Sequence, residues 1–295
     1  MNSQHFDLIR ATIFRVFRRV SVLLYFCILF APLLQAAEPA FVRESIRARG
    51  MGNAFTAAAN DEMLLFYNPA ALRSVYYNIY QIAGFNTTYN ENIKNLGNSS
   101  SGFSTLGSLA GKNLHNETDI GFLSHVNSRF GWSLFTNYFV DIQVRNPVIP
   151  YLETKAYAQY GLALGMAWSF MDYQLDVGLG GKLATRKGID KKLHISDPAV
   201  IELIEDQKTT KLMKLAETSE TSLAPDFGVI YHFDSYHNME PKVAFSLQNI
   251  GGLDFEGAGK VPMTMNIGVS TESEFNGFDM ILAADYRDLA DSQGM

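Results

Sequence analysis

The 295-residue sequence contains a single cysteine, and the lack of further cysteines excludes two classes of protein. With Cys27 as the only thiol, no disulfide can form within the chain and no cysteine cluster can hold a metal. Cys27 also follows Phe26, so it lacks the small preceding residue of a lipoprotein cleavage site. Disulfide-stapled scaffolds and cysteine metal sites are therefore excluded.

Charge is also scarce, and positive charge is the rarer sign. Charged residues make up 18% of the chain and aromatic residues 13%, whereas soluble domains average roughly 25% charged residues. The 24 basic and 30 acidic residues give a net charge of −6. Because an acidic chain is repelled by phosphates, we expect no nucleic-acid partner. Few charges and many aromatic residues favour a protein that faces lipid.

Long apolar runs are nearly absent, with one exception near the start. Residues 20–35 are almost wholly apolar, follow three arginines within residues 15–19, and precede the small pair Ala36 and Ala37. A run of about 16 residues is short for a spanning helix and typical of a cleaved signal peptide. We predict a signal peptide over residues 1–37, with a retained membrane anchor as the alternative. Its removal leaves 20 basic and 29 acidic residues, a net charge of about −9.

Catalytic and metal-binding patterns are missing as well. The histidines after the apolar run are scattered without the spacing of metal ligands: His115, His125, His194, His232 and His237. Asp226, His232 and Asp234 lie near one another in sequence, but polar pairs of this kind are also expected inside a barrel. We therefore expect no enzyme activity, no cofactor and no metal.

What is abundant is alternation with a period of two residues. Within residues 156–170, large apolar side chains occupy one parity and small or polar ones occupy the other. This pattern predicts β-strands with one apolar face. The same reading predicts nine strands, near residues 76–90, 119–127, 131–142, 156–170, 173–186, 223–234, 242–250, 261–271 and 278–286.

Four features favour a membrane barrel over the alternative, a soluble β-sandwich. Strands of roughly 9–15 residues suit a tilted bilayer crossing, and aromatic residues cluster at strand ends as an interfacial girdle would. The connections alternate between long loops and tight turns, as in outer-membrane barrels. The polar face carries charges that suit a wet lumen better than a dry core, namely Asp176, Lys182, Asp226, His232 and Asp285. We expect an all-β, antiparallel outer-membrane β-barrel over residues 76–295.

The number of strands is odd, whereas bacterial single-chain barrels close with an even number. Either the strand assignment is wrong or the sequence is a C-terminally truncated version of a longer barrel. The segment "ILAADYRDL", at residues 281–289, has the character of a further strand beginning, which favours truncation.

A glycine- and alanine-rich segment precedes the first strand. Its pattern R-x-x-GMG-x-AF-x-A-A-x-D followed by YNPA-x-L resembles the N-terminal region of FadL/TodX-type outer-membrane proteins, shared with PorV-like secretion and TraF-like conjugation proteins. Ala71 departs from the glycine that many relatives carry after NPA. The later segments "APDFGVIYHF", "KVAFSLQNIGG" and "VPMTMNIGVS" are closer to the PorV-like and TraF-like branch. The matching N-terminal residues are Arg47, Gly50, Met51, Gly52, Ala54, Phe55, Asp61, Tyr67, Asn68, Pro69, Ala70 and Leu72.

The resemblance implies a barrel of about 14 strands when complete, with residues 38–75 folded into it as a helical hatch. Its small residues would let a plug helix fit beside lumenal glycines at 161, 165, 178 and 180, and Asn68-Pro69 would end that helix. A phosphate-binding loop is the alternative, but no strand precedes Gly50 and no Lys-Ser/Thr pair follows. The expected hatch motif is Gly50, Met51, Gly52, Phe55, Tyr67, Asn68 and Pro69, and the expected ligand path is Phe55, Met63 and Phe66.

The resemblance also implies a function. FadL-type proteins take up hydrophobic compounds such as long-chain fatty acids passively, so the expected partners are outer-membrane lipid and such a ligand. The alternative is a non-transporting docking or assembly partner of a secretion or conjugation system. In both cases the expected location is the bacterial outer membrane.

One long insertion, residues 187–222, stands apart from the alternating strands. Asp197 and Pro198 form a helix start, and an intermittent apolar stripe follows. We predict a helical external loop that either offers a landing groove or docking surface, or packs back on the barrel rim.

Overall fold

A computed structural model describes residues 42–92, 113–145, 151–194, 219–235, 239–275 and 278–289. All of these residues belong to one compact unit, Pro39–Met295. The predicted signal peptide, residues 1–37, lies outside the described residues.

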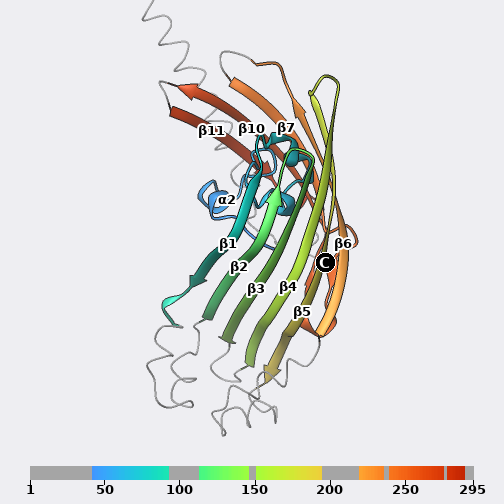
Figure 1. The fold of residues 1–295 in the computed structure, drawn as a ribbon. Helices are drawn as coiled ribbons and strands as arrows, with labels where there is room; N and C mark the ends of the chain where they lie inside the picture. Colours follow the sequence, from blue (N-terminus) through green and yellow to red (C-terminus); the bar gives the residue numbers. More distant parts are fainter. Residues whose placement is uncertain are drawn as a thin grey trace, which may run out of the picture. The chain divides into compact units, whose positions relative to one another are not determined.

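Nine strands form one antiparallel sheet in which each strand pairs with its neighbours along the chain (Figure 1). The order in the sheet is β1-β2-β3-β4-β5-β6-β7-β10-β11. The nine strands confirm the predicted positions along the chain. Their bounds are β1 Ile79–Tyr89, β2 Asn113–Val126, β3 Phe130–Arg145, β4 Tyr151–Phe170, β5 Leu175–His194, β6 Ser219–His232, β7 Met239–Gln248, β10 Thr264–Phe275 and β11 Phe278–Tyr286.

Several strands are longer than predicted, because pairing continues where the apolar alternation stops. Strands β4 and β5 each span 20 residues and stay in register from Phe170 and Leu175 to Tyr151 and His194. Their polar ends carry cross-strand ion pairs, such as Lys155 with Asp190 at 3.7 Å, of the kind that supports a ladder without apolar packing.

The bounds of the predicted insertion are consequently wrong. Residues 187–194 and 219–222 belong to strands, and the predicted helix falls within residues 195–218, outside the described residues. The predicted alternation of loop lengths is also weaker than expected. The connection between β3 and β4 shrinks to residues 146–150, hardly longer than the turn at residues 171–174.

The two faces of the sheet are opposite in character. Alternate residues on the convex face are apolar and exposed, including Leu134, Tyr138, Tyr160, Leu164, Trp168, Leu179, Leu183, Ile267, Val269 and Leu282. Apart from apolar residues such as Phe135 and Ile230, the intervening residues on the concave face are small or polar. The buried polar ones include Asp119, Ser133, Asn137, Gln159, Asp176, Lys182, Arg186, Asp226, Ser246 and Gln248. A soluble sheet places its apolar face inward, so this sheet has the reverse arrangement.

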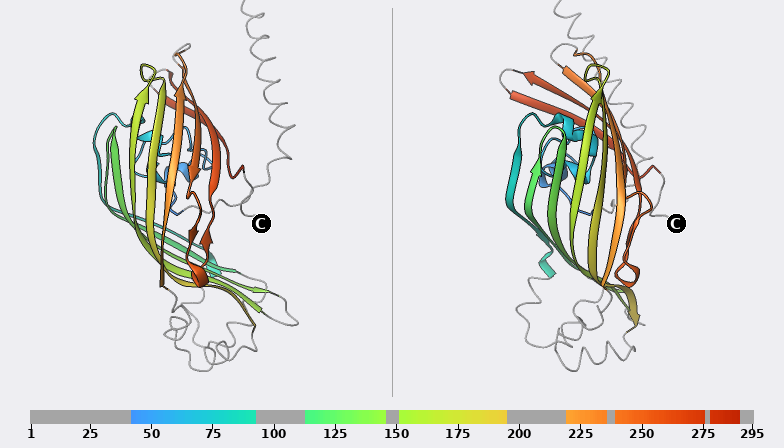
Figure 2. Two further views of the ribbon diagram at one scale, coloured as in Figure 1. Left: turned by 90° about the vertical axis from the view of Figure 1, so that its right-hand side faces the viewer. Right: turned by 45° about the vertical axis from the view of Figure 1, so that its right-hand side comes forward.

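Strands β1 and β11 are the two edges of the sheet, and within the described residues they do not pair with each other. The sheet is strongly curved but open (Figures 1 and 2). The described residues therefore show an antiparallel all-β sheet and not a closed barrel.

Residues 42–75, here called the N-terminal segment, lie within the curve of the sheet (Figure 2). They contain the helix α2 (Ile46–Gly50) and two 3-10 helices, η2 (Leu64–Phe66) and η3 (Pro69–Ser74). The prediction of one plug helix ended by Asn68-Pro69 was wrong. Helix α2 stops at Gly50, because Gly52 and Asn53 adopt left-handed backbone angles, and Asn68 starts η3 by capping the backbone N–H of Ala70.

The connection from β7 to β10 forms a small hairpin that the sequence analysis missed. It consists of β8 (Leu253–Asp254), the 3-10 helix η4 (Glu256–Ala258) and β9 (Lys260–Val261). Its apolar residues are buried: Leu253, Phe255, Ala258 and Val261. The Phe255 ring lies 4.4 Å from the guanidinium carbon of Arg186 in β5, so the hairpin covers part of the concave face.

Candidate functional site: the N-terminal segment on the concave face

The segment is fixed to one edge of the sheet by a carboxylate. Asp285 in β11 accepts hydrogen bonds from the backbone N–H groups of Phe55 and Thr56, both at 2.8 Å and both through Oδ2. The backbone approaches closely here, since a Cβ on Gly268 of β10 would lie 3.1 Å from the backbone nitrogen of Ala57. A charged acceptor that receives two backbone donors gives a strong and directional attachment.

Glycines in the central strands make room for the segment. A Cβ on Gly178 of β5 would collide with backbone atoms of Pro69 and Ala70, and one on Gly228 of β6 with the Asn68 side chain. Gly165, predicted to leave space, would meet Leu65 at 2.5 Å, whereas Gly161 accommodates Phe135 of the sheet itself. The tightest contact between segment and sheet is therefore at Asn68–Ala70.

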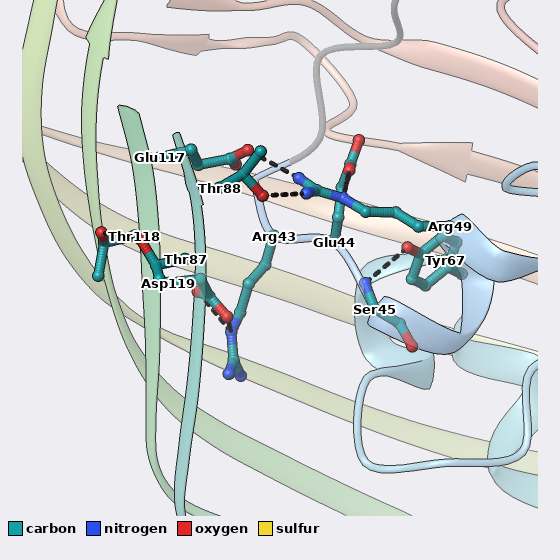
Figure 3. A network of polar contacts seen from close by, with 10 residues as sticks. All are labelled: Arg43, Glu44, Ser45, Arg49, Tyr67, Thr87, Thr88, Glu117, Thr118 and Asp119. Carbon is teal, nitrogen blue, oxygen red and sulfur yellow. Dashed lines mark hydrogen bonds and ion pairs between the residues drawn. The ribbon is translucent and has the colours of Figure 1, made fainter. Parts of the chain in front are cut away.

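The segment reaches the other edge of the sheet through two arginines (Figure 3). Arg43 Nε donates to both carboxylate oxygens of Asp119 in β2 at 2.8 Å, and both side chains are buried. Arg49 donates to Glu117 of β2 at 2.7 Å and to the Thr88 hydroxyl of β1 at 2.8 Å. Because a buried ion pair strongly penalises the loss of one partner, the Arg43–Asp119 pair fixes the position of the segment.

Tyr67 joins the two ends of the segment. Its hydroxyl accepts a hydrogen bond from the backbone N–H of Ser45 at 2.9 Å (Figure 3), and its ring packs edge-on against Phe55 at 5.1 Å. Burial raises the pKa of the Tyr67 hydroxyl, which keeps it neutral. The Tyr67 carbonyl accepts hydrogen bonds from Ser246 and Gln248 of β7, at 2.6 and 3.0 Å.

Asp61 lies beside this junction. Its carboxylate accepts hydrogen bonds from the Met63 backbone at 2.9 Å and from the Ser45 hydroxyl at 3.2 Å. Burial raises the pKa of Asp61 above its ordinary value, and the nearby charge of Glu62 adds to the shift. Ionised Asp61 therefore costs folding free energy in this position.

The predicted hatch-motif residues separate into two groups. Gly50 and Gly52 are exposed at the end of the helix, where a Cβ on either would meet nothing within 4 Å. Met51 is half-buried and packs against the buried apolar cluster. Phe55, Tyr67, Asn68 and Pro69 are buried and carry the contacts described above.

The predicted ligand-path residues lie together inside the molecule. The exposed fractions of Phe55, Met63 and Phe66 are 0%, 7% and 2%. Phe66 packs edge-on against Phe135 of β3 with ring centroids 5.3 Å apart. All three side chains belong to one buried apolar cluster that also contains residues of the sheet.

Of the five charged residues predicted for a wet lumen, Asp176, Lys182 and Asp226 are buried, whereas His232 and Asp285 are half-buried. Lys182 Nζ donates to Asp226 at 3.0 Å and to Asn249 at 3.2 Å, and the ammonium and carboxylate are both almost fully buried. His232 contacts Asp176 at 2.7 Å and not Asp226. The expectation of solvated charges was wrong for Asp176, Lys182 and Asp226, because each of these side chains is buried against a polar partner.

Sequence reasoning missed Arg43 altogether. It lies before the GMG pattern, and its partner Asp119 is 76 residues away, so no local spacing relates the two. The one available signal was a single arginine in the segment "AFVRES", directly after apolar residues.

No family model matches the chain, no curated protein is significantly similar to it, and no solved structure is significantly similar to its fold. Among the described residues, none of the helices has the length and apolar character needed to cross a membrane. In the same ranges, no group of three or more His, Cys, Asp or Glu side chains is placed to hold a metal ion.

Proposed function

We propose that this chain is an outer-membrane β-barrel protein that lets hydrophobic compounds such as long-chain fatty acids cross passively, with the N-terminal segment as its hatch. The observation that carries the proposal is the reversed sheet. Large apolar side chains such as Leu164 and Trp168 are exposed on the convex face, while buried polar side chains line the concave face. This arrangement is favourable when lipid surrounds the convex face, whereas in water the large apolar side chains of that face would be exposed to solvent.

The hatch role is supported by how the segment is held. It fills the concave face through polar contacts to both edge regions of the sheet, at Asp285 and at Asp119. Water can replace such polar contacts when the segment moves. The segment also packs on the sheet through a buried apolar cluster, in which Phe66 lies against Phe135. Displacing the segment would expose the aromatic cluster of Phe55, Phe66 and Phe135, which suits an acyl chain at about 0.8 kcal/mol per buried methylene.

The experiment is a titration of the refolded, detergent-solubilised chain with a fluorescent long-chain fatty acid, after heat-modifiable gel migration has verified folding. The test variant carries Asn68→Ala and Pro69→Ala, which remove the cap of η3 and the Asn68 contact to the Thr56 carbonyl. The control is Asn78→Ala, an exposed asparagine whose side chain hydrogen-bonds only to His125 among the described residues. Saturable binding that the double variant changes and Asn78→Ala does not is the expected result.

A second candidate is a docking or assembly partner of a secretion or conjugation system. The observation that favours it is a pair of exposed tyrosines, Tyr76 at 91% and Tyr77 at 72%, between η3 and β1. Tyrosine is enriched in protein interfaces. A folded chain that binds no fatty acid, and whose binding to an envelope protein is lost in Tyr76→Ser and Tyr77→Ser, would replace transport with docking.

A further inference from the structure

A notch lies at the end of the sheet that carries the tight turns at residues 127–129 and 171–174. Strand β4 runs past its neighbour here, because Phe130, the first residue of β3, pairs with Met166 and β4 continues to Phe170. The backbone N–H of Ala167 still donates to the Arg129 carbonyl at 3.0 Å. Beyond it, the projecting end of β4 borders a cavity of about 600 Å³.

Two arginines line this cavity without a carboxylate partner. The Arg129 side chain is exposed and makes no hydrogen bond or ion pair within the described residues. Arg73 donates from Nε to Ser169 Oγ at 2.6 Å and from Nη1 to the Ser128 carbonyl at 2.8 Å. In the described part of the chain no ion pair joins either arginine to Asp172, which also lines the cavity. Two uncompensated guanidinium groups at one cavity favour an anion.

Neighbouring residues fix the position of the Arg73 guanidinium. Ser169, which accepts from Arg73, donates its own proton to the buried carboxylate of Asp176 at 2.5 Å. The Tyr173 ring lies 5.8 Å from the Arg73 guanidinium carbon on the cavity side. The second terminal nitrogen, Nη2, has no hydrogen-bond partner within the described ranges. A guanidinium that is already fixed in position and still has an unused N–H donor loses little conformational entropy when it binds an anion.

The turn that carries Tyr173 is strained. Met171, Asp172 and Tyr173 have φ values of 53°, 53° and 71°, so three consecutive residues other than glycine adopt the left-handed region. Such backbone costs free energy and persists where the surrounding structure demands it, often at a binding site. Here the strain places the Tyr173 ring against Arg73.

The outer wall of the notch is apolar and continuous with the convex face. Met166, Trp168 and Phe170 are exposed on it, at 49%, 43% and 52%. Tryptophan beside basic residues is typical of the level at which lipid headgroups lie. A ligand that suits both walls therefore combines an anionic group with acyl chains.

We propose that this notch binds the phosphate of a membrane lipid headgroup, with the acyl chains along Met166, Trp168 and Phe170. The phosphate oxygens accept hydrogen bonds from the Arg129 guanidinium and from Arg73 Nη2. This inference rests on the proposed function, which places the convex face in a bilayer.

The test uses tryptophan quenching, because the chain has only two tryptophans, Trp132 and Trp168. In a Trp132→Phe background, Trp168 reports from the wall of the notch. The refolded chain in uncharged maltoside micelles is titrated with phosphatidylglycerol brominated on its acyl chains, and with equally brominated diacylglycerol, which lacks the phosphate. We expect the phosphate-bearing lipid to quench at a concentration about tenfold lower.

The decisive variant is Arg129→Gln, since that side chain is exposed and makes no hydrogen bond or ion pair within the described residues. It should remove the tenfold preference, and Arg73→Gln should do the same. The matched control is Lys187→Gln, which removes one exposed positive charge nearer the far end of β5. An unchanged preference in Arg129→Gln would overturn the proposal.

The remaining outcomes separate the notch from the proposed function. Equal quenching by both brominated lipids would overturn the proposed phosphate site in the notch and leave the membrane assignment intact. No quenching by either lipid, in a chain shown to be folded, would contradict the exposure of the convex face to lipid. Displacement of the lipid by an equal concentration of inorganic phosphate would assign the arginines to a water-soluble anion and overturn the lipid assignment.

Discussion

Asp285 accepts a 2.8 Å hydrogen bond from the backbone N–H of Thr56, a residue 229 positions earlier in the chain. The same carboxylate oxygen holds Phe55. One side chain thereby connects the edge strand β11 to the N-terminal segment.

Replacing Asp285 with alanine should release this part of the segment. Two hydrogen bonds to a charged acceptor disappear, so we expect the free energy of unfolding to fall by about 2–3 kcal/mol. Trypsin should then cleave faster at Arg47 and Arg49, which limited proteolysis followed by mass spectrometry will show. Asp279→Ala, an exposed change in the same strand, is the control. Equal cleavage rates in the two variants would contradict the attachment.

The Arg43–Asp119 pair gives a second prediction. Arg43→Met alone leaves a buried carboxylate without its partner and should cost about 3–5 kcal/mol. The double variant Arg43→Met with Asp119→Leu should recover a large part of this loss, because neither charge is then buried. Denaturant unfolding in micelles measures both single variants, Arg43→Met and Asp119→Leu, and the double variant in one double-mutant cycle. Additive losses would mean that the two side chains do not interact.

Asp61 predicts a pH dependence of stability. Because burial raises its pKa in the folded state, its favourable contribution is present below the ordinary carboxyl pKa and is lost as the pH rises through the raised value. Asp61→Asn, which cannot ionise, should therefore be more stable than the wild type at neutral pH and lose this advantage in acid. The measurement is the difference in unfolding free energy between variant and wild type at pH 4 and pH 7. A difference independent of pH would show that Asp61 does not titrate with folding.

Gly178 predicts a steric effect. A Cβ at this position meets backbone atoms of Pro69 and Ala70, which cannot rotate away, so Gly178→Ala should destabilise by about 1–3 kcal/mol or displace η3. Gly181→Ala in the same strand is the control, because the nearest atom would lie 3.4 Å from its new Cβ. Thermal unfolding followed by circular dichroism compares the two. Similar melting temperatures would place η3 away from β5.

The strands could be predicted because their alternation is local. In β4, Leu164 and Trp168 face outward and Ala163 and Ala167 inward, so the two-residue period is visible in the sequence itself. Strand ends could not be predicted in the same way. Lys155 and Asp190 extend the pairing of β4 and β5 with polar side chains. Their pairing depends on a strand register that only the folded sheet defines.

The candidate site was predictable only in part. The small residues and Asn68-Pro69 indicated a segment that packs closely. Asn68 and Pro69 do lie against β5 and β6, whereas a Cβ on Gly50 or Gly52 would meet nothing within 4 Å. The local conformation of the segment depends on left-handed backbone angles at Gly52 and Asn53. The prediction of a single plug helix did not anticipate them. The partners of Arg43 and Thr56 lie too far along the chain for any spacing argument.

The contact between Thr56 and Asp285 also bears on the order of events during synthesis. The N-terminal segment leaves the ribosome before every strand of the sheet, yet one of its anchors lies in β11, the last strand described. Contacts at such separation form slowly, since a long stretch of chain must be ordered first. The first-made part of this compact unit therefore acquires its contact with Asp285 only after the last described strand has been made.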